Sequence, residues 1–454
     1  MAFHNIEKYD RRYAFLKRFV NFNFKSWFRK VTIKGKENIP DDAPVIFAPN
    51  HQNALMDALA ILASTEGQPV FLARSDIFKK PLVSKILTFL KILPIYRIRD
   101  GYGNLKMNNE IIQKIIDILS RNHSLIIFPE GNHGNQRKLR PFKKGISRIA
   151  FQTEEAFDYQ LDTKIIPVGL DYSDYYKFNH ELLINFGKPI DVKSFIPLYK
   201  ENPSKAHRAL IEEIASQLKP LMVHIDETDY YDSINELREI YKYRMKDQMN
   251  LSGLTHDKKL QADQTLIDIC QQKIKEQPTQ AKKIDENIRT YTAYRNKLNL
   301  REWVFQKGSA SWLSLIVQAP LLIAFFPVFL YGLINHLLPS FIPYYISGKM
   351  KDPQFWSSIR STLSLITFPL FYIIQSLIVL LLTPQNMLAL VYLASLPVSG
   401  FLAYRYSVWF KKWRARLRFN WFKSNQHKFL AQTMQLRNKI MHQMDEWTRQ
   451  HLEP

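Results

Sequence analysis

Short apolar runs alternate with amphipathic stretches over the first half of the chain. The runs "APVIFAPN", "QPVFLAR", "KILPIYRIR", "SLIIFPEGN", "KIIPVGLDY" and "ELLINFGKPI" are typical of buried strands, and "VTIKGKENIP" of a strand that enters a turn. Between them, "NALMDALAILAS" and "NNEIIQKIIDILSR" carry apolar residues at helical spacing. This alternation predicts an α/β domain with a central, largely buried sheet over residues 31–218.

The regions around this domain have different patterns. Residues 1–30 mix basic and aromatic residues, which fits either an amphipathic helix at a membrane interface or a helix packed on the next domain. Residues 219–305 are charged and predict an α-helical insert, in which Pro278 separates two helices. Residues 306–410 are strongly apolar, and residues 411–454 predict a basic helical tail.

Three apolar segments, at about 311–338, 362–383 and 387–409, are long enough to cross a bilayer as transmembrane helices. Basic residues flank the first segment, the loop before the second and the tail, and the positive-inside rule places all of them in the cytoplasm. Three crossings conflict with that assignment. One solution is that the first segment, which has Pro320 and Pro327 inside it and Pro339 directly after it, is a broken re-entrant hairpin. The sequence thus predicts an integral membrane protein with its α/β domain on the cytoplasmic side.

Composition narrows the classes of partner. The formal net charge of +22 points to a polyanion, such as nucleic acid, an anionic phospholipid membrane or a phosphorylated substrate. The basic residues flank apolar spans and no recognition motif for nucleic acid is found, so we expect a membrane and no nucleic acid. The single cysteine excludes an internal disulfide framework, and no spacing of ligands suggests a metal site.

His51 and Asp57 lie where an apolar strand should end and a helix begin, which is where open α/β sheets bind ligands. Positions six apart on a regular helix differ by about 240° around its axis, so the side chains would not meet there. We therefore expect His51 before the helix, in an extended turn that brings it over Asp57. A carboxylate on one ring nitrogen would leave the other free to take a proton from a hydroxyl. A capping histidine and a surface aspartate are the alternative interpretation.

Three later stretches carry residues that suit a phosphate. Guanidinium groups make bidentate contacts, lysines act as point charges, and glycines allow the backbone to approach closely. These residues are Arg97 and Arg99 in "LPIYRIRDG", Glu130 and Gly131 in "IIFPEGNHG", and Arg140, Lys143 and Lys144 in "RPFKKG". Together with the His–Asp pair, they predict a phosphorylated substrate.

The order of four motifs resembles the glycerolipid acyltransferase superfamily. The motifs are "NHQNALMD", the strand that ends in "PIYR", "FPEG" and "IPVGL", and the resemblance covers residues 30 to 195. This family includes glycerol-3-phosphate and 1-acylglycerol-3-phosphate acyltransferases. The resemblance implies that His51 is the general base, that Asp57 orients it, and that Arg97 contacts the phosphate of the acceptor.

Further roles follow from the same resemblance. Glu130 and Gly131 match the residues that shape the acceptor site, and Pro167 matches a motif on the acyl-donor side. Lys143 and Lys144 are added as binding residues on their charge and placement alone.

The sequence departs from the family pattern around both main motifs. Five residues separate His51 from Asp57 instead of the commoner four, which is similar to fungal glycerol-3-phosphate acyltransferases with C-terminal membrane segments. An Asn132–His133 pair follows "FPEG" where Thr–Arg is usual, so Arg140 or Lys143 is expected to replace the missing arginine. His133 is either a second candidate base or a solvated turn residue.

The resemblance implies a membrane-bound acyltransferase of phospholipid biosynthesis. Its acyl donor would be acyl-CoA or acyl-ACP, the latter making acyl carrier protein a partner. Its acceptor would be the hydroxyl of 1-acylglycerol-3-phosphate, with glycerol-3-phosphate as the alternative, and no cofactor is expected. A non-catalytic membrane adaptor with a relic domain is a rival reading, but the intact His51 and Asp57 argue against it.

Overall fold

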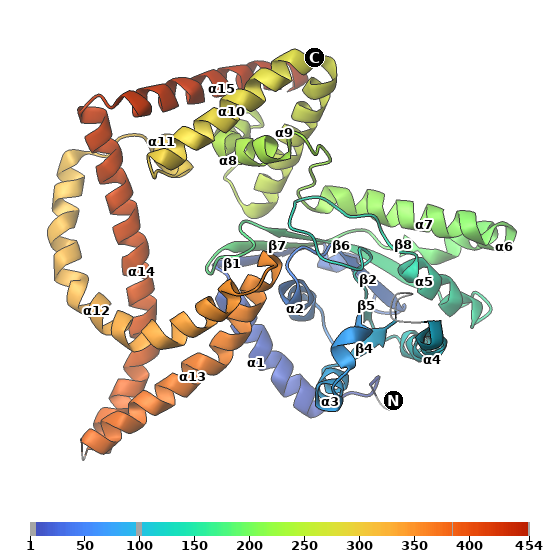
Figure 1. Ribbon diagram of the computed structural model, residues 1–454. Helices are drawn as coiled ribbons and strands as arrows, with labels where there is room; N and C mark the ends of the chain where they lie inside the picture. Colours follow the sequence, from blue (N-terminus) through green and yellow to red (C-terminus); the bar gives the residue numbers. More distant parts are fainter. Residues whose placement is uncertain (1–5, 97–101, 384, 453–454) are drawn as a thin grey trace. The chain divides into compact units, whose positions relative to one another are not determined.

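The structure is a computed structural model that describes residues 6–96, 102–383 and 385–452 (Figure 1). It divides into two compact units. The first combines Met1–His224 with a short later segment, Met350–Ser361. The second comprises Ile225–Lys349 and Thr362–Pro454.

Eight strands from the described part of the chain form one sheet in the first unit. They are β1 (Lys30–Lys34), β2 (Val45–Pro49), β3 (Val70–Arg74), β4 (Ile92–Ile95), β5 (Leu125–Ile126), β6 (Lys164–Tyr172), β7 (Glu181–Phe186) and β8 (Ile190–Asp191). Their order is β1-β7-β6-β2-β5-β3-β4, and β8 pairs with β6. The strands from β6 to β4 in that order run parallel, so their carboxyl ends meet at one edge.

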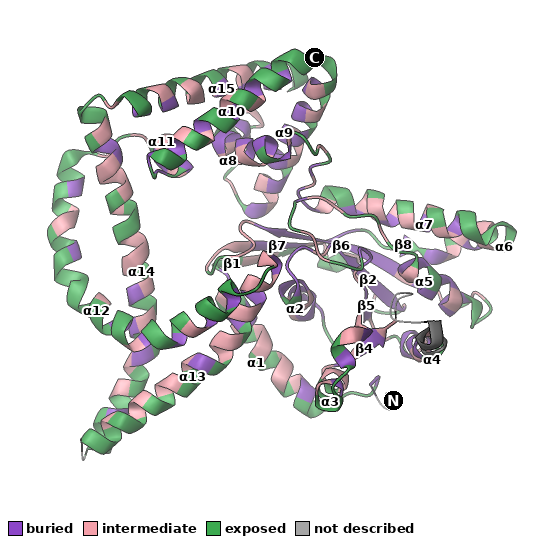
Figure 2. Cartoon of the chain, in the orientation of Figure 1, coloured by how far each residue is buried: buried purple, intermediate pink, exposed green. Residues whose placement is uncertain are grey.

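Helices cover both faces of this sheet. They are α1 (Arg11–Trp27), α2 (Leu55–Ser64), α3 (Pro81–Phe89), α4 (Tyr102–Leu119), α5 (Gly145–Glu155), α6 (Ile196–Glu201) and α7 (Pro203–Leu218). One apolar core joins α1 and α2 to the sheet, and another joins α4, α5 and α7 to its other face. All of β2 and nearly all of β6 are buried, and Figure 2 shows the strands mostly in the buried colour. The prediction of an α/β domain with a largely buried sheet is confirmed.

The N-terminal helix α1 has two kinds of aromatic residue. Tyr13 and Phe24 are buried in the first unit, whereas Phe15, Phe19 and Phe22 are exposed. The two interpretations of residues 1–30 are therefore compatible, since one face packs on the domain while the other remains available to a membrane interface.

The run predicted as a single strand over residues 181–190 forms two strands instead. β7 ends at Phe186, and the N–H of Gly187 then donates to the carbonyl oxygen of Pro167 at 2.8 Å. Pro167 lacks an N–H, and it lies between the part of β6 that pairs with β8 and the part that pairs with β7. A proline is tolerated at this central position because the ladder on that side is interrupted there.

The second unit contains a bundle of charged helices. It consists of α8 (Tyr231–Gln248), α9 (His256–Glu276), α10 (Pro278–Lys297), α11 (Glu302–Lys307) and the C-terminal α15 (Lys428–Leu452). Pro278 starts α10, so the predicted break between two helices is confirmed. α15 packs against α8, α9 and α10, so the insert and the tail form one bundle.

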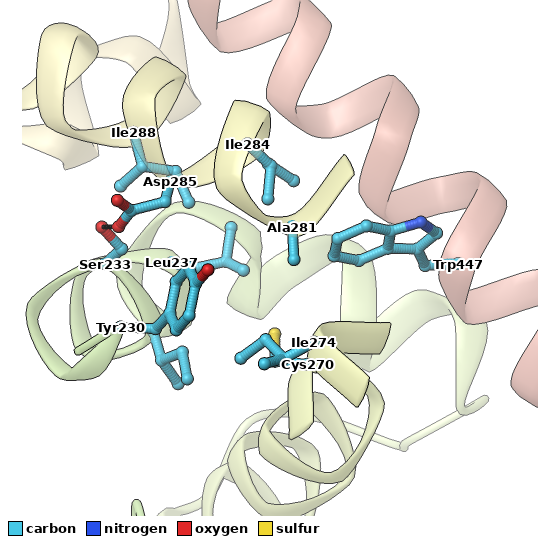
Figure 3. A pocket seen from close by; sticks show the side chains of 11 residues that line it. Tyr230, Ser233, Leu237, Cys270, Ile274, Ala281, Ile284, Asp285, Ile288 and Trp447 are labelled. Atoms are coloured by element: carbon cyan, nitrogen blue, oxygen red, sulfur yellow. Dashed lines mark hydrogen bonds between the residues drawn. The ribbon is translucent and has the colours of Figure 1, made fainter. Parts of the chain in front are cut away.

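A small cavity lies inside this bundle (Figure 3). It holds about 20 Å³, and its lining includes Cys270, Ala281, Ile284 and Trp447. An apolar space of that size is close to the volume of a single water, so it is a packing void and no binding site.

Three further helices of the described residues are long and apolar enough to cross a membrane. They are α12 (Trp312–Gly348), α13 (Trp356–Leu382) and α14 (Asn386–Ser424). Their most apolar stretches are only 11%, 6% and 17% buried by protein, respectively. α12 is one continuous helix and lacks the predicted break, but its four prolines leave it strongly bent (Figure 1).

Candidate active site

The end of β2 is fixed to the neighbouring strand by Asn50. Its side-chain amide donates to the carbonyl oxygen of Leu170 at 3.1 Å and accepts from the Leu170 N–H at 2.6 Å. Leu170 belongs to β6, so this side chain continues the pairing of the two strands beyond Pro49. His51, the next residue, thus leaves the sheet at a defined point of its carboxyl edge.

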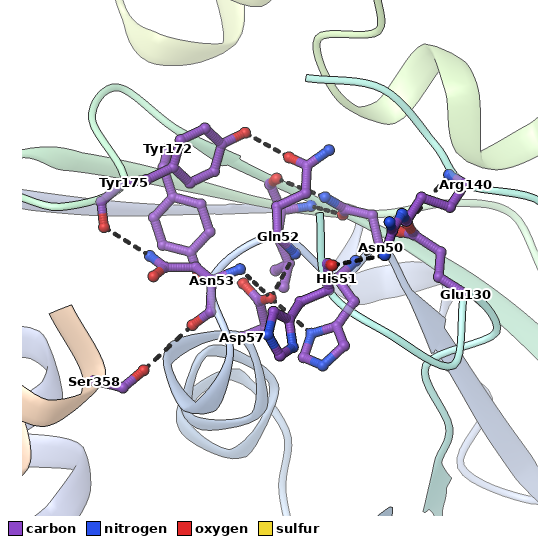
Figure 4. Close-up of polar contacts among 12 residues, drawn as sticks. Asn50, His51, Gln52, Asn53, Asp57, Glu130, Arg140, Tyr172, Tyr175 and Ser358 are labelled. Atoms are coloured by element: carbon purple, nitrogen blue, oxygen red, sulfur yellow. Dashed lines mark hydrogen bonds and ion pairs between the residues drawn. The ribbon is translucent and has the colours of Figure 1, made fainter. Parts of the chain in front are cut away.

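The Asp57 carboxylate is the centre of the turn that follows (Figure 4). Its Oδ2 lies 2.9 Å from His51 Nδ1 and accepts the backbone N–H groups of Gln52 at 2.8 Å and Asn53 at 2.7 Å. Its Oδ1 accepts the hydroxyl of Tyr172 at 2.8 Å. Asp57 is fully buried, and these four donors satisfy it.

The turn between His51 and Asp57 has an unusual backbone at one position. Ala54, which caps α2, has a φ of +44°, a region that residues with a Cβ rarely adopt. The helix therefore starts abruptly after this residue, and Asp57 lies in its first turn. The extended turn that the five-residue spacing predicts is present, and surrounding contacts hold its strained residue in place.

The His51 ring is held on two sides. It stacks on Phe128 with 4.1 Å between ring centroids, and its side chain is 17% exposed. Because Asp57 occupies the Nδ1 side, the tautomer with the proton on Nδ1 leaves Nε2 as a free acceptor. An imidazole in this state can take a proton from a hydroxyl placed beside Nε2.

Glu130 ties the "FPEG" turn to the histidine. Its two carboxyl oxygens accept the N–H of His51 at 2.8 Å and the N–H of Arg140 at 3.1 Å. Burial raises the pKa of the Glu130 carboxyl to about 8, although the two backbone donors act in the opposite direction. The next residue, Gly131, has a φ of +65°, and a Cβ there would lie 3.2 Å from the Lys143 side chain.

The remaining predicted residues occupy different positions. Lys143 and Lys144 are exposed, just before and at the cap of α5, and the Lys143 N–H donates to the carbonyl oxygen of Pro129 at 2.8 Å. Arg140 donates to the carbonyl oxygen of His133 at 2.8 Å, within the same loop. Pro167 is buried within β6.

Arg97 and Arg99 lie outside the described residues, after the end of β4. No group of three or more metal-ligating side chains comes together in residues 6–96, 102–383 and 385–452.

Comparisons with known proteins assign this region. The model of the acyltransferase family matches residues 30–171, which contain the His51–Asp57 turn and the "FPEG" turn. Residues 30–171 form an acyltransferase domain. The motif order of the sequence and this match agree on the glycerolipid acyltransferase superfamily.

Several relatives of the acyltransferase domain are similar at low identity. A chloroplastic 1-acyl-sn-glycerol-3-phosphate acyltransferase of Brassica napus is 27% identical over 145 residues, which cover 30% of this chain and 40% of the relative. A 1-acyl-sn-glycerol-3-phosphate acyltransferase of Borreliella burgdorferi is 27% identical over 202 residues, covering 43% and 74%. Glycerol-3-phosphate O-acyltransferase 1 of Saccharomyces cerevisiae is 24% identical over 134 residues, covering 29% and 18%. The chain thus spans less than half the length of the plant and yeast relatives.

The first unit also contains site residues that the sequence analysis missed. Tyr172 reaches Asp57 from the end of β6, and its position as a polar residue closing an apolar strand was the available signal. Arg137 is buried, with Nη1 2.9 Å from Asp171 Oδ1 and Nη2 donating to the Tyr172 carbonyl oxygen at 2.7 Å. Only the fold brings it there, because its sequence neighbours carry no pattern.

Proposed function

We propose that the protein is a membrane-bound acyltransferase that acylates the hydroxyl of 1-acylglycerol-3-phosphate, with acyl-CoA or acyl-ACP as the donor. The observation that carries the proposal is the 2.9 Å contact between His51 Nδ1 and Asp57 Oδ2 at the carboxyl edge of the parallel strands. Relatives named for this acceptor support it.

The reaction needs a single base and no acyl-enzyme. His51 Nε2 takes the proton of the acceptor hydroxyl as its oxygen attacks the thioester carbonyl carbon. The new ester C–O bond forms, the C–S bond breaks, and the leaving thiolate takes the proton back from the imidazolium. Asp57 stabilises the imidazolium between these two transfers, because its Oδ2 faces Nδ1.

Basic residues of the predicted motifs would bind the acceptor phosphate. Arg97 follows β4, which belongs to the same parallel group as β2. Lys143 lies against Gly131, and the adjacent Lys144 is also exposed. Arg140 is the candidate for the arginine missing after "FPEG". These cations suit a phosphate that approaches the sheet edge from solvent.

Glycerol-3-phosphate is the second candidate acceptor. The five residues between His51 and Asp57 favour it, and the yeast relative carries the name of that activity. The two acceptors bear the same phosphate, so the phosphate contacts do not separate them. They differ in the acyl chain, which would require a lysolipid to enter from the bilayer.

We further propose a cytoplasmic catalytic domain and a first apolar helix that enters and leaves on one side. Within the described part of the chain, the first helix that could cross a membrane begins at Trp312, so the catalytic domain and the insert share a side. The first compact unit, which holds His51 and Asp57, is called the catalytic unit below. Met350–Ser361, which follows α12, belongs to it, and α15, which follows α14, packs on the insert. α13 and α14 then cross as a hairpin, and the basic residues Lys349 and Lys351 favour the cytoplasm.

Cysteine labelling in sealed vesicles tests this topology. In a Cys270→Ser background, single cysteines at Lys307, Lys351 and Gln385 would be exposed to a membrane-impermeant maleimide. We expect the first two to react from the same side and the third from the opposite side. Labelling of the first two from opposite sides would instead mean that α12 spans.

The acceptor assay tests the proposed function. Purified full-length protein in vesicles would receive radiolabelled acyl-CoA or acyl-ACP, with each acceptor offered separately. We expect transfer to 1-acylglycerol-3-phosphate, a loss of about a hundredfold or more in His51→Ala, and wild-type activity in His442→Ala, which alters an exposed histidine of α15. Transfer only to glycerol-3-phosphate would select the second candidate, and transfer to neither would reject both.

A further inference from the structure

The connection between the apolar helices α12 and α13, together with the first six residues of α13, forms a segment that is folded into the catalytic unit. This segment, Met350–Ser361, is called the strap below. Its polar residues Gln354, Ser357, Ser358 and Ser361 are at most 8% exposed. The hydroxyl groups of Ser357 and Ser358 find hydrogen-bond partners in the same unit, so the strap is a fitted part of the unit rather than a loose linker.

Two hydroxyl groups of the strap hold Asn53, and Figure 4 shows the one of Ser358. The hydroxyl of Ser357 donates to the side-chain oxygen of Asn53, and that of Ser358 donates to its carbonyl oxygen at 3.4 Å. Asn53 is 1% exposed, and its own N–H donates to Asp57 Oδ2 at 2.7 Å. The strap therefore contacts a residue of the His51–Asp57 turn that itself donates a hydrogen bond to the carboxylate that orients His51.

A second contact reaches the histidine that follows "FPEG". Asp352 Oδ2 lies 3.3 Å from His133 Nε2, and the Phe355 ring meets the His133 ring edge-on, with centroids 4.7 Å apart. The His133 ring in turn lies edge-on to the His51 ring, with 5.5 Å between centroids. The strap thus contacts two neighbours of His51: Asn53 in the turn that follows it, and His133, whose ring lies against the His51 ring.

The far end of the strap is also anchored. Arg360 donates to the carbonyl oxygen of Tyr176 at 3.2 Å, and its guanidinium lies 5.3 Å from the centre of the Trp356 ring. Trp356 packs edge-on against the Tyr176 ring at 5.9 Å. With both ends and the middle attached, the position of the strap is set by the catalytic unit.

We propose that the strap completes the active site, with Ser357 and Ser358 positioning the His51–Asp57 turn through Asn53. Asp352 positions His133 beside His51 in the same way. These are positioning residues, since none of them acts on the substrate itself. Because the strap joins α12 to α13, acyl transfer would depend on how these two helices are placed in the membrane. The inference rests on the proposed function, because activity is one of its two readouts.

The test uses full-length protein in lipid nanodiscs and compares Ser357→Ala and Ser357→Ala/Ser358→Ala with the wild type. Removing a donor from a buried acceptor should speed hydrogen exchange in residues 50–57 and lower kcat, each about tenfold, with KM within about twofold of wild type. The matched control is Ser204→Ala, which alters an exposed serine of α7. Unchanged exchange in residues 164–172 shows that β6 remains folded in every variant.

A double-mutant cycle sharpens the same test. If Ser357 acts through Asn53, adding Ser357→Ala to Asn53→Ala should lower kcat no further than Asn53→Ala does alone. Full additivity would overturn the proposal, as would faster exchange in residues 50–57 with an unchanged kcat, or no change in either. If the wild type transfers no acyl group but Ser357→Ala still speeds hydrogen exchange in residues 50–57, the proposed function is overturned. The contact by which the strap positions the turn would then still stand.

Discussion

The strand β2 and the helix α13 are both apolar, but protein surrounds β2 and leaves most of α13 uncovered. Every residue of β2 is buried by protein, whereas only 6% of the most apolar stretch of α13 is. Burial in protein and burial in lipid both remove apolar surface from water, so apolar content alone does not separate them. Length and neighbours do separate them, because β2 is short and flanked by partner strands, while α13 is long enough to cross a bilayer.

The largest effect is expected at Asp57, a fully buried carboxylate in the region that protein covers. Asp57→Asn keeps the size of the side chain but removes the carboxylate that sets the His51 tautomer. We expect kcat/KM for acyl transfer to fall by about a thousandfold to ten-thousandfold. Steady-state kinetics in vesicles measure it, with Asp41→Asn, an exposed residue, as the control. Near-normal turnover of Asp57→Asn would separate this carboxylate from catalysis.

A pair of phenylalanine substitutions extends the comparison of β2 to a second apolar helix, α12. Phe47 in β2 is 1% exposed and packs on Phe186, so Phe47→Ala should lower the free energy of unfolding by about 3–5 kcal/mol. Phe325 in α12 is 53% exposed from protein, so Phe325→Ala should leave it nearly unchanged in lipid. Denaturant unfolding in bicelles measures both. Equal losses would mean that α12 is covered by protein rather than by lipid.

A charged residue placed in α13 tests whether this helix faces lipid. Ile373 is 56% exposed in the middle of this helix. Ile373→Asp should disfavour membrane insertion by about 2.5–3.5 kcal/mol, whereas Ile373→Leu should be neutral. The fraction of protein that resists carbonate extraction reports the difference. If Ile373→Asp inserted as well as wild type, the lipid-facing assignment of α13 would be wrong.

The last test concerns the pH dependence of stability through Glu130, a buried carboxyl group of the catalytic unit. Its pKa is about 8 in the folded protein, against an ordinary 4.5 in the unfolded chain, so unfolding releases a proton between these values. Stability contributed by this group is present below pH 4.5 and is lost as pH rises, at about 1.4 kcal/mol per pH unit between about 5 and 7.5. Glu130→Gln should flatten this slope in thermal melts. An identical slope in the variant would show that other groups cause it.

The sequence predicts the fold well where the pattern is local. β6 spans the predicted run, residues 164 to 172, because a continuous apolar strand is a clear signal. β5 is only two residues long, although its apolar run is longer, because the chain turns away from the sheet to form the "FPEG" turn. α3 was not predicted, although Leu82, Ile86 and Phe89 recur at helical spacing, because nine residues are fewer than a helix pattern usually needs to be recognised.

The candidate site divides in the same way. The meeting of His51 and Asp57 could be predicted, because a spacing of six excludes a regular helix between them. The contacts of Tyr172 with Asp57 and of Ser357 with Asn53 could not, since they join residues 115 and 304 positions apart. Such pairs leave no trace in periodicity or composition, and only the folded chain brings them together.

Chemical rescue of the histidine is the most direct test of the role assigned to it. His51→Gly removes the imidazole and leaves space beside Asp57, so added imidazole can take its place in full-length protein in vesicles. We predict acyl transfer that is lost in His51→Gly and is partly restored as imidazole is added, with no such response in wild type. Acyl transfer by His51→Gly at the wild-type rate without imidazole would contradict the assignment of His51 as the general base.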